Sequence, residues 1–164
     1  MEIFKEEFVR EGKIVLKQKD KLLISHLRNN GRKNVTDIAK ETNIPVTTIY
    51  DRLRAAEKQF LKHTSLVNFN KLGFQVAFIL FSVNKNKKDE LHDFLMDSPL
   101  VNSLSKVDYG SKYQAEVVLK NTDELDLLGD VLNKEFGVTD IQVNYASEEC
   151  KRESFLTRME HFGE

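Results

Sequence analysis

Five side chains able to form hydrogen bonds lie along a helix expected over residues 46–58. The set is Thr47, Thr48, Tyr50, Asp51 and Arg54. Most of them are three or four residues apart, a spacing that places side chains on one face of a helix. Hydroxyl, carboxylate and guanidinium groups on such a face can read base edges in the major groove of DNA. Helical hairpins with charged outer faces are also common without any nucleic acid, so this face alone does not decide between the two.

The elements around this face favour the DNA interpretation. Apolar residues recur along the same helix at intervals of 3, 4 and 3, at Val46, Ile49, Leu53 and Ala56. They would pack inward while the polar set faces out. A shorter helix is expected from Asn34, because Asn34 and Asp37 have the spacing of a capping box. Asn43 tolerates a left-handed backbone and Pro45 disfavours helix at its predecessor, so the chain should turn there. Two helices joined by a tight turn form a helix-turn-helix.

Basic residues around this hairpin could bind phosphates. The set is Arg32, Lys33, Arg52, Lys58 and Lys62. Residues 17–62 hold eleven basic and five acidic residues, a net charge of +6, whereas residues 64–164 hold eleven and seventeen, a net charge of −6. A basic unit joined to an acidic one indicates that only the first approaches a polyanion. A third helix is expected over residues 17–30, with His26 as a partly buried histidine rather than a ligand.

Length and composition exclude several classes of protein. The 164 residues are 40% hydrophobic and 31% charged, as in globular domains, and suffice for two small ones. The longest apolar run, residues 76–81, is too short to cross a bilayer, so we expect a cytoplasmic protein with no membrane partner. Cys150 is the single cysteine, which excludes an internal disulfide and a cysteine-based zinc site.

The C-terminal half predicts a βαββαβ domain. Strands are expected over 74–84, 101–109, 113–120 and 138–146, and helices over 87–97 and 121–137. This order is ferredoxin-like, so the fold class is α+β. Residues 60–68 favour a short strand pair, or wing, between the two halves. We therefore expect an N-terminal extension over 1–16 with a short helix, a winged helix-turn-helix over 17–68, the ferredoxin-like domain over 69–147 and a helical tail over 148–164.

The strand over residues 74–84 is apolar on both alternating faces. Two helices can cover only one face of a small sheet, so the other face calls for a second copy of the sheet. We expect a homodimer whose interface uses Ala77, Ile79, Phe81 and Val83.

With both halves laid out, the chain resembles the Lrp/AsnC family of transcriptional regulators, in which a winged helix-turn-helix precedes a ferredoxin-like domain. The resemblance covers residues 16–146. It rests on residues 16–20, 30–32, 37–39, 44, 48–53 and 71–73. It implies a regulator that binds double-stranded DNA, forms dimers that can assemble into tetramers or octamers, and senses a small molecule such as an amino acid.

Three positions depart from the family pattern. Pro45 stands where the family usually has Ser, so the helix after the turn lacks a side-chain cap, and Phe60 stands where the family has Gly. The family's effector loop resembles Gly-x-Tyr-Asp, whereas this chain is one residue longer and has Gln in place of Asp. The resemblance places an effector at Gly110, Ser111, Lys112, Tyr113 and Gln114; the alternative is a plain hairpin.

Enzyme signatures are absent from the sequence. It has no glycine-rich phosphate loop, no paired histidines at metal spacing and no nucleophile motif, so we expect no catalytic residues, no metal and no cofactor. One enzymatic alternative stays open, because siroheme decarboxylases resemble the same two-domain architecture. A basic helix-turn-helix has no use in tetrapyrrole chemistry, which favours regulation.

Overall fold

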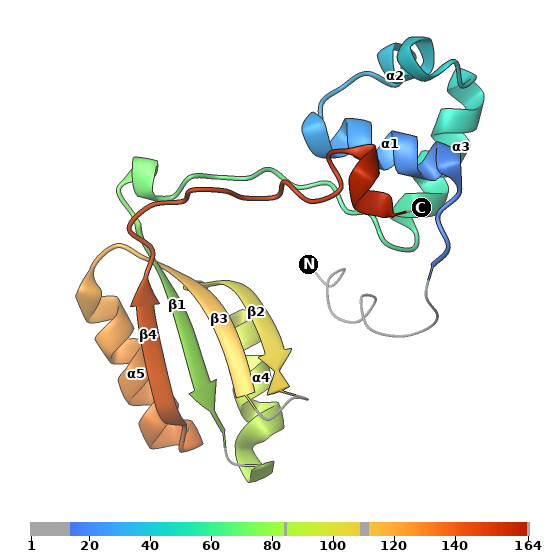
Figure 1. Cartoon of the computed structure of the whole chain (residues 1–164). Coiled ribbons are helices and arrows are strands. Elements are labelled where there is room, and N and C mark those ends of the chain that lie inside the picture. Colours follow the sequence, from blue (N-terminus) through green and yellow to red (C-terminus); the bar gives the residue numbers. More distant parts are fainter. Residues whose placement is uncertain (1–13, 84, 109–111, 164) are drawn as a thin grey trace. The chain divides into compact units, whose positions relative to one another are not determined.

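The computed structural model describes residues 14–83, 85–108 and 112–163 of the chain, which form two compact units (Figure 1). The first unit comprises the chain up to Ser65 together with Lys151–Glu164, and the second is Leu66–Cys150. The expected boundaries at 68 and 147 therefore shift by three residues each, and the C-terminal segment groups with the N-terminal helices. The helix expected within residues 2–10 lies outside the described residues.

Among the described residues, three α-helices build the first unit: α1 (Gln18–Asn29), α2 (Val35–Thr42) and α3 (Val46–Glu57). They converge on a small core of Leu23, Ile38, Ile44 and Ile49. The capping box expected at Asn34 is wrong, because the Asn34 side chain makes no cap hydrogen bond. A carboxylate serves α1 instead: the backbone N–H of Lys17 donates to Asp20 Oδ2 at 3.0 Å.

The turn between α2 and α3 confirms the expectation for Asn43 and Pro45. Asn43 ends α2 in the left-handed conformation, with φ of 54°. Pro45 precedes α3 without any side-chain cap hydrogen bond, and its carbonyl accepts from Ile49 N–H as the first helical bond. The direction of α3 is therefore set by the backbone of residues 43–45 rather than by a capping side chain.

The strand pair expected over residues 60–68 does not form. Residues 61–68, all within the described part of the chain, carry neither helix nor strand. Leu66 and Val67, two apolar residues of this segment, are exposed.

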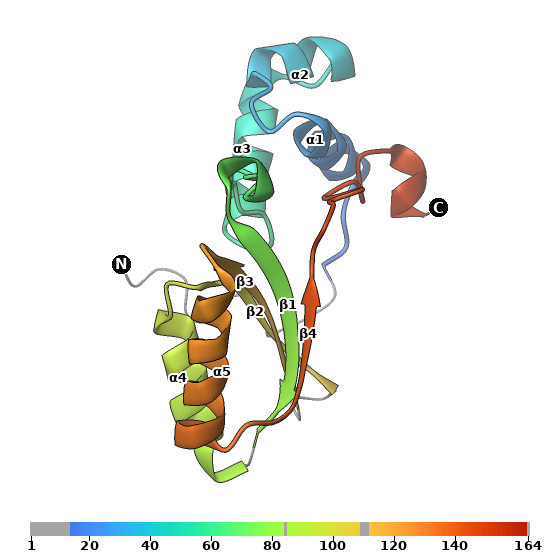
Figure 2. The same cartoon turned by 90° about the vertical axis from the view of Figure 1, so that its left-hand side faces the viewer.

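The second unit is the expected ferredoxin-like domain. Its elements are β1 (Gln75–Ser82), α4 (Lys88–Asp97), β2 (Val101–Val107), β3 (Lys112–Leu119), α5 (Thr122–Phe136) and β4 (Thr139–Tyr145). The sheet order is β2-β3-β1-β4 and every described pair is antiparallel. Figure 2 shows α4 and α5 side by side on one face of this sheet. Asn121 caps α5, its Oδ1 accepting from Glu124 N–H at 3.1 Å.

The expected interface residues of β1 lie on the wrong face. Ala77, Ile79 and Phe81 are at most 1% exposed and pack with the two helices, and Val83 packs against the same core. The open face carries the alternate residues, of which Phe78 is 39% exposed. Both faces of the strand are apolar, so alternation could not say which one the helices would cover.

The C-terminal tail is not the expected amphipathic helix. After β4 the chain has a single 3₁₀ turn, Met159–Phe162, and no α-helix in residues 146–163. Glu153 and Leu156 have φ values of 52° and 62°, a left-handed conformation that interrupts a right-handed helix. The tail still half-buries three apolar side chains, those of Leu156, Met159 and Phe162.

Candidate nucleic-acid interface

The outward face of α3 carries four exposed side chains at helical spacing. Thr47, Asp51, Arg54 and Lys58 are all exposed, whereas Ile49 is 1% and Ala56 7% exposed on the opposite side. Successive members of the exposed set are four, three and four residues apart, so they form one stripe along the helix. The structure therefore brings three of the five predicted base-reading residues into this stripe.

The other two predicted base-reading residues flank the stripe. Tyr50 is 49% exposed on one side of it, and Thr48 is half-buried on the other. Tyr50 therefore presents an aromatic ring with a hydroxyl beside the stripe, and Thr48 exposes only part of its side chain.

Arg52 does not project to solvent as a phosphate contact would. Its Nη1 donates to Asp20 Oδ1 at 2.6 Å, and the Arg52 and Asp20 side chains are only 26% and 22% exposed. The ion pair joins α3 to α1 and holds the recognition face against the other helices. An acid in the first turn of α1 was the available signal for this pairing, but the sequence does not show that the two helices meet there.

Lys33 is likewise engaged within the protein. Its ammonium donates to Glu41 Oε2 at 2.5 Å and lies 3.2 Å from His26 Nδ1. The hydrogen bond from Lys33 is the main reason that the pKa of Glu41 lies below its ordinary value, and the charges of Lys33 and His26 add to it. His26 is a half-buried member of this cluster, as expected.

The remaining basic residues predicted to bind phosphates are exposed. They are Arg32, Lys58 and Lys62. Arg32 follows α1, Lys58 ends α3 and Lys62 lies just beyond it, so all three occur at helix ends or in connecting segments. Such positions suit contacts with a phosphate backbone, which need charge rather than a rigid orientation.

The residues predicted to bind an effector do not converge within this chain. Gly110 and Ser111 lie outside the described residues. Tyr113 is 0% exposed and packs against Phe81 in the core, whereas Gln114 is exposed on the open face of the sheet. Burial raises the pKa of Tyr113, with a smaller contribution from the charge of Asp89. Neighbouring residues of a strand point to opposite faces, so these two side chains cannot line one site in a single subunit.

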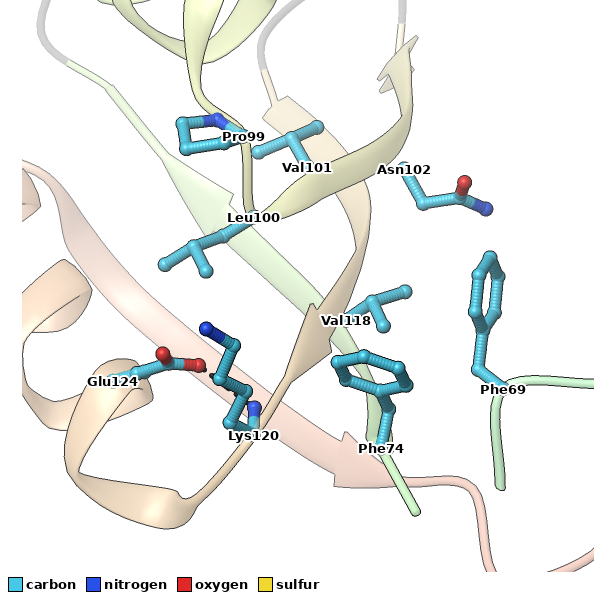
Figure 3. A pocket seen from close by; sticks show the side chains of 9 residues that line it. All are labelled: Phe69, Phe74, Pro99, Leu100, Val101, Asn102, Val118, Lys120 and Glu124. Atoms are coloured by element: carbon cyan, nitrogen blue, oxygen red, sulfur yellow. Dashed lines mark hydrogen bonds between the residues drawn. The ribbon is translucent and has the colours of Figure 1, made fainter. Parts of the chain in front are cut away.

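A pocket that sequence reasoning missed lies at the other end of β2 and β3. It has a volume of about 430 Å³ and is lined by Phe69, Phe74, Pro99, Leu100, Val101, Asn102, Val118, Lys120 and Glu124. Figure 3 shows Lys120 and Glu124 on one side of it and Phe69 and Asn102 on the other. Glu124 Oε2 accepts from the backbone N–H of Lys120 at 2.7 Å, which holds the carboxylate beside the lysine.

The comparisons with known proteins agree with this arrangement. Residues 16–59 match the winged helix-turn-helix DNA-binding family. The chain is 27% identical over 126 residues to the HTH-type transcriptional regulator FL11 of Pyrococcus horikoshii, covering 73% of this chain and 83% of that protein. This chain is a transcriptional regulator with a helix-turn-helix DNA-binding domain.

Solved structures of transcriptional regulators share the fold over most of this chain. A transcriptional regulator of Neisseria meningitidis in complex with L-Met has a TM-score of 0.71 at 18% identity, with 84% of this chain and 94% of that one covered. The leucine response regulatory protein of Mycobacterium tuberculosis has a TM-score of 0.70 at 18% identity, with 84% and 97% covered. These relatives are regulators rather than enzymes, and they give the tetrapyrrole decarboxylase alternative no support. No helix among the described residues is long and apolar enough to cross a membrane.

Proposed function

We propose that this regulator reads a specific DNA sequence in the cytoplasm through the exposed stripe of α3. Thr47, Asp51 and Arg54 are proposed to contact base edges, with Tyr50 and Thr48 at the margins of the contact. Arg32, Lys58 and Lys62 are proposed to contact phosphates. The observation that carries the proposal is the stripe itself, which is exposed along α3 directly opposite Ile49 and Ala56. Arg52 and Lys33 are assigned to structural ion pairs instead.

The test begins with the genomic DNA fragments that the purified protein retains, from which a site is defined. Arg54→Ala should then weaken binding to that site by about 1–3 kcal/mol and blur its preference. Arg32→Ala should weaken binding to all DNA sequences alike. It should also reduce the slope of log affinity against log salt concentration by about one. Lys134→Ala is the matched control, because it removes one positive charge from α5 in the other unit. Unchanged affinity and preference in Arg54→Ala would refute docking through α3.

The open face of the sheet is proposed to form a homodimer. β1 contributes Val76, Phe78 and Leu80 to this face, and Val118 lies opposite Val76 on β3. A second copy would cover this apolar strip and present two recognition helices to a two-fold DNA site. Assembly of dimers into tetramers or octamers is part of the same proposal.

Sedimentation of two matched variants tests the dimer. Phe78→Asp places a charge on the open face beside Glu116 and should yield monomers. Leu127→Asp makes the same kind of change at a 67% exposed position on α5 and should stay dimeric. A monomeric wild-type protein at micromolar concentration, or a dimeric Phe78→Asp, would contradict the proposal.

A small-molecule effector is proposed to bind the pocket between Phe74 and Lys120. Its apolar wall, with one ammonium and one carboxylate at the side, suits an amino acid with an apolar side chain. The Neisseria regulator in complex with L-Met supports this class of ligand. Calorimetric titration with L-amino acids tests it: Lys120→Ala should abolish binding, whereas Lys106→Ala on β2, outside the pocket lining, should not. If Lys120→Ala still binds the amino acid, the effector does not bind in this pocket.

A further inference from the structure

The C-terminal segment belongs to the DNA-binding unit although it follows the other unit in sequence. Residues 151–163 lie against α1, as Figures 1 and 2 show for the turn at Met159–Phe162. The chain thus passes between the two units twice, once near residue 65 and again near residue 150.

Two side chains at the end of α1 hold the segment. Arg28 Nε donates to the carbonyl of Phe155 at 3.0 Å, and its Nη1 donates to Glu153 Oε2 at 2.5 Å. Asn29 Nδ2 donates to the carbonyl of Thr157 at 2.6 Å. Within the segment the Phe155 ring stacks on His161, with centroids 5.4 Å apart. Arg28 therefore serves as a fork that binds a backbone carbonyl and a carboxylate together.

The face of α1 that carries these contacts is not the face in the three-helix core. Ile24 and Ser25 precede Arg28 and Asn29 by one turn, so the four share one side of α1. Both are buried, at 5% and 8% exposed, yet neither belongs to the core cluster around Leu23. The segment therefore binds at the end of the same side of α1 on which these two buried residues lie.

The docking contacts are weak enough to open. The Arg28 and Glu153 side chains are 29% and 48% exposed, and ion pairs so accessible to water contribute little. Glu153 and Leu156 hold left-handed backbone conformations that cost free energy in residues other than glycine. Local opening with a small free energy is typical of such peripheral segments.

We propose that the docked segment is a releasable second tether between the two units. While it is docked, two lengths of chain join the DNA-binding unit to the C-terminal domain and restrict its rotation. When it is released, only residues 61–68 join them and the unit rotates more freely. This step rests on the DNA binding proposed above. Release would lower the affinity for an operator with two half-sites, because the α3 helix of the second subunit would no longer be held ready to bind the second half-site.

Limited proteolysis tests the docking without any DNA. Trypsin cleavage after Arg158 releases residues 159–164, which the mass of the remaining chain reports. Glu153→Ala should accelerate this cleavage about fivefold, which corresponds to an interaction of about 1 kcal/mol. Glu148→Ala, the matched control, removes an exposed carboxylate outside the docked segment that makes no ion pair among the described residues, and it should leave the cleavage rate unchanged. Equal cleavage rates in the wild type and Glu153→Ala would overturn the docking.

Amide ¹⁵N relaxation of the full-length protein then tests the tether. Asn29→Ala combined with Glu153→Ala should shorten the rotational correlation time of α2 and α3 relative to that of the sheet. The same variant should keep the α2 and α3 amide shifts, which shows that the helices remain folded. Faster cleavage without any change in correlation time would overturn the tether, because the segment would then only cover α1. Neither readout involves DNA, so failure of the DNA proposal leaves both results interpretable.

Discussion

The two units are held together in different ways. Among the described residues, the second unit buries thirteen in one apolar cluster, whereas the first buries four. Ion pairs between separate elements occur in the first unit, which has the smaller core. Arg52–Asp20 and Arg28–Glu153 join separate elements of the first unit, but Lys134–Asp130 and its counterparts in the second lie within four residues of sequence. A small helical unit that gives one helix face to solvent has little apolar surface left to bury, so polar contacts between elements supplement the core.

The largest expected effect sharpens this contrast on a single strand. Phe81→Ala should lower the free energy of unfolding by about 3–5 kcal/mol, because the Phe81 ring is 0% exposed in the larger core. Phe78→Ala, three residues away on the open face, should change the unfolding of an isolated subunit far less. Urea unfolding of both variants, at protein concentrations low enough to keep the subunits apart, measures the difference; similar losses would mean that the helices do not cover the Phe81 face.

A smaller effect is expected where a polar contact joins two helices of the first unit. Asp20→Ala leaves the Arg52 guanidinium without its carboxylate and should destabilise the unit by about 1–3 kcal/mol. Asp37→Ala, whose carboxylate is 3.9 Å from Lys40 and half-exposed, should cost less than about 1 kcal/mol. Hydrogen exchange of the α3 amides measures both. If Asp20→Ala costs no more than Asp37→Ala, the small core alone is holding this unit.

The smallest effect is a pH dependence. The pKa of Glu41 is lowered by Lys33, so folding favours the carboxylate. Its contribution to stability is complete above the ordinary value of 4.5 and is lost as the pH falls through the lowered pKa. Glu41→Gln should therefore flatten the acid side of the stability curve, measured by urea unfolding from pH 7 to pH 3. Glu160→Gln is the control, and a Glu41→Gln curve parallel to the wild type would contradict the assignment.

Local patterns predicted most of the fold because local physics decides it. The left-handed Asn43, the capped start of α5 and the order of strands and helices all follow from a few neighbouring residues. The fold class and the regulatory function are confirmed. The exposed stripe on α3 was also predictable, since helical period separates Thr47 and Arg54 from Ile49.

The sequence was insufficient wherever distant elements decide the outcome. β1 is apolar on both sides, and only the packing of α4 and α5 makes Phe81 internal and Phe78 external. The sequence around Arg52 favours a phosphate contact. In the structure, however, Arg52 Nη1 donates to Asp20 Oδ1 of α1 at 2.6 Å. The sequence of the tail favours a helix, but the tail packs on α1 with only a single 3₁₀ turn among its described residues.

The course of protein synthesis gives the C-terminal segment another consequence. The ribosome makes α1 well before the residues that bind Arg28 and Asn29, which lie 127 and 128 residues later in the chain. Synthesis adds about 5–20 residues per second, so the C-terminal segment follows α1 by on the order of ten seconds. The ferredoxin-like domain can complete its sheet before that moment. The DNA-binding unit is thus finished after the ferredoxin-like domain, and a chain that stops before residue 151 would leave the outer side of α1 without this segment.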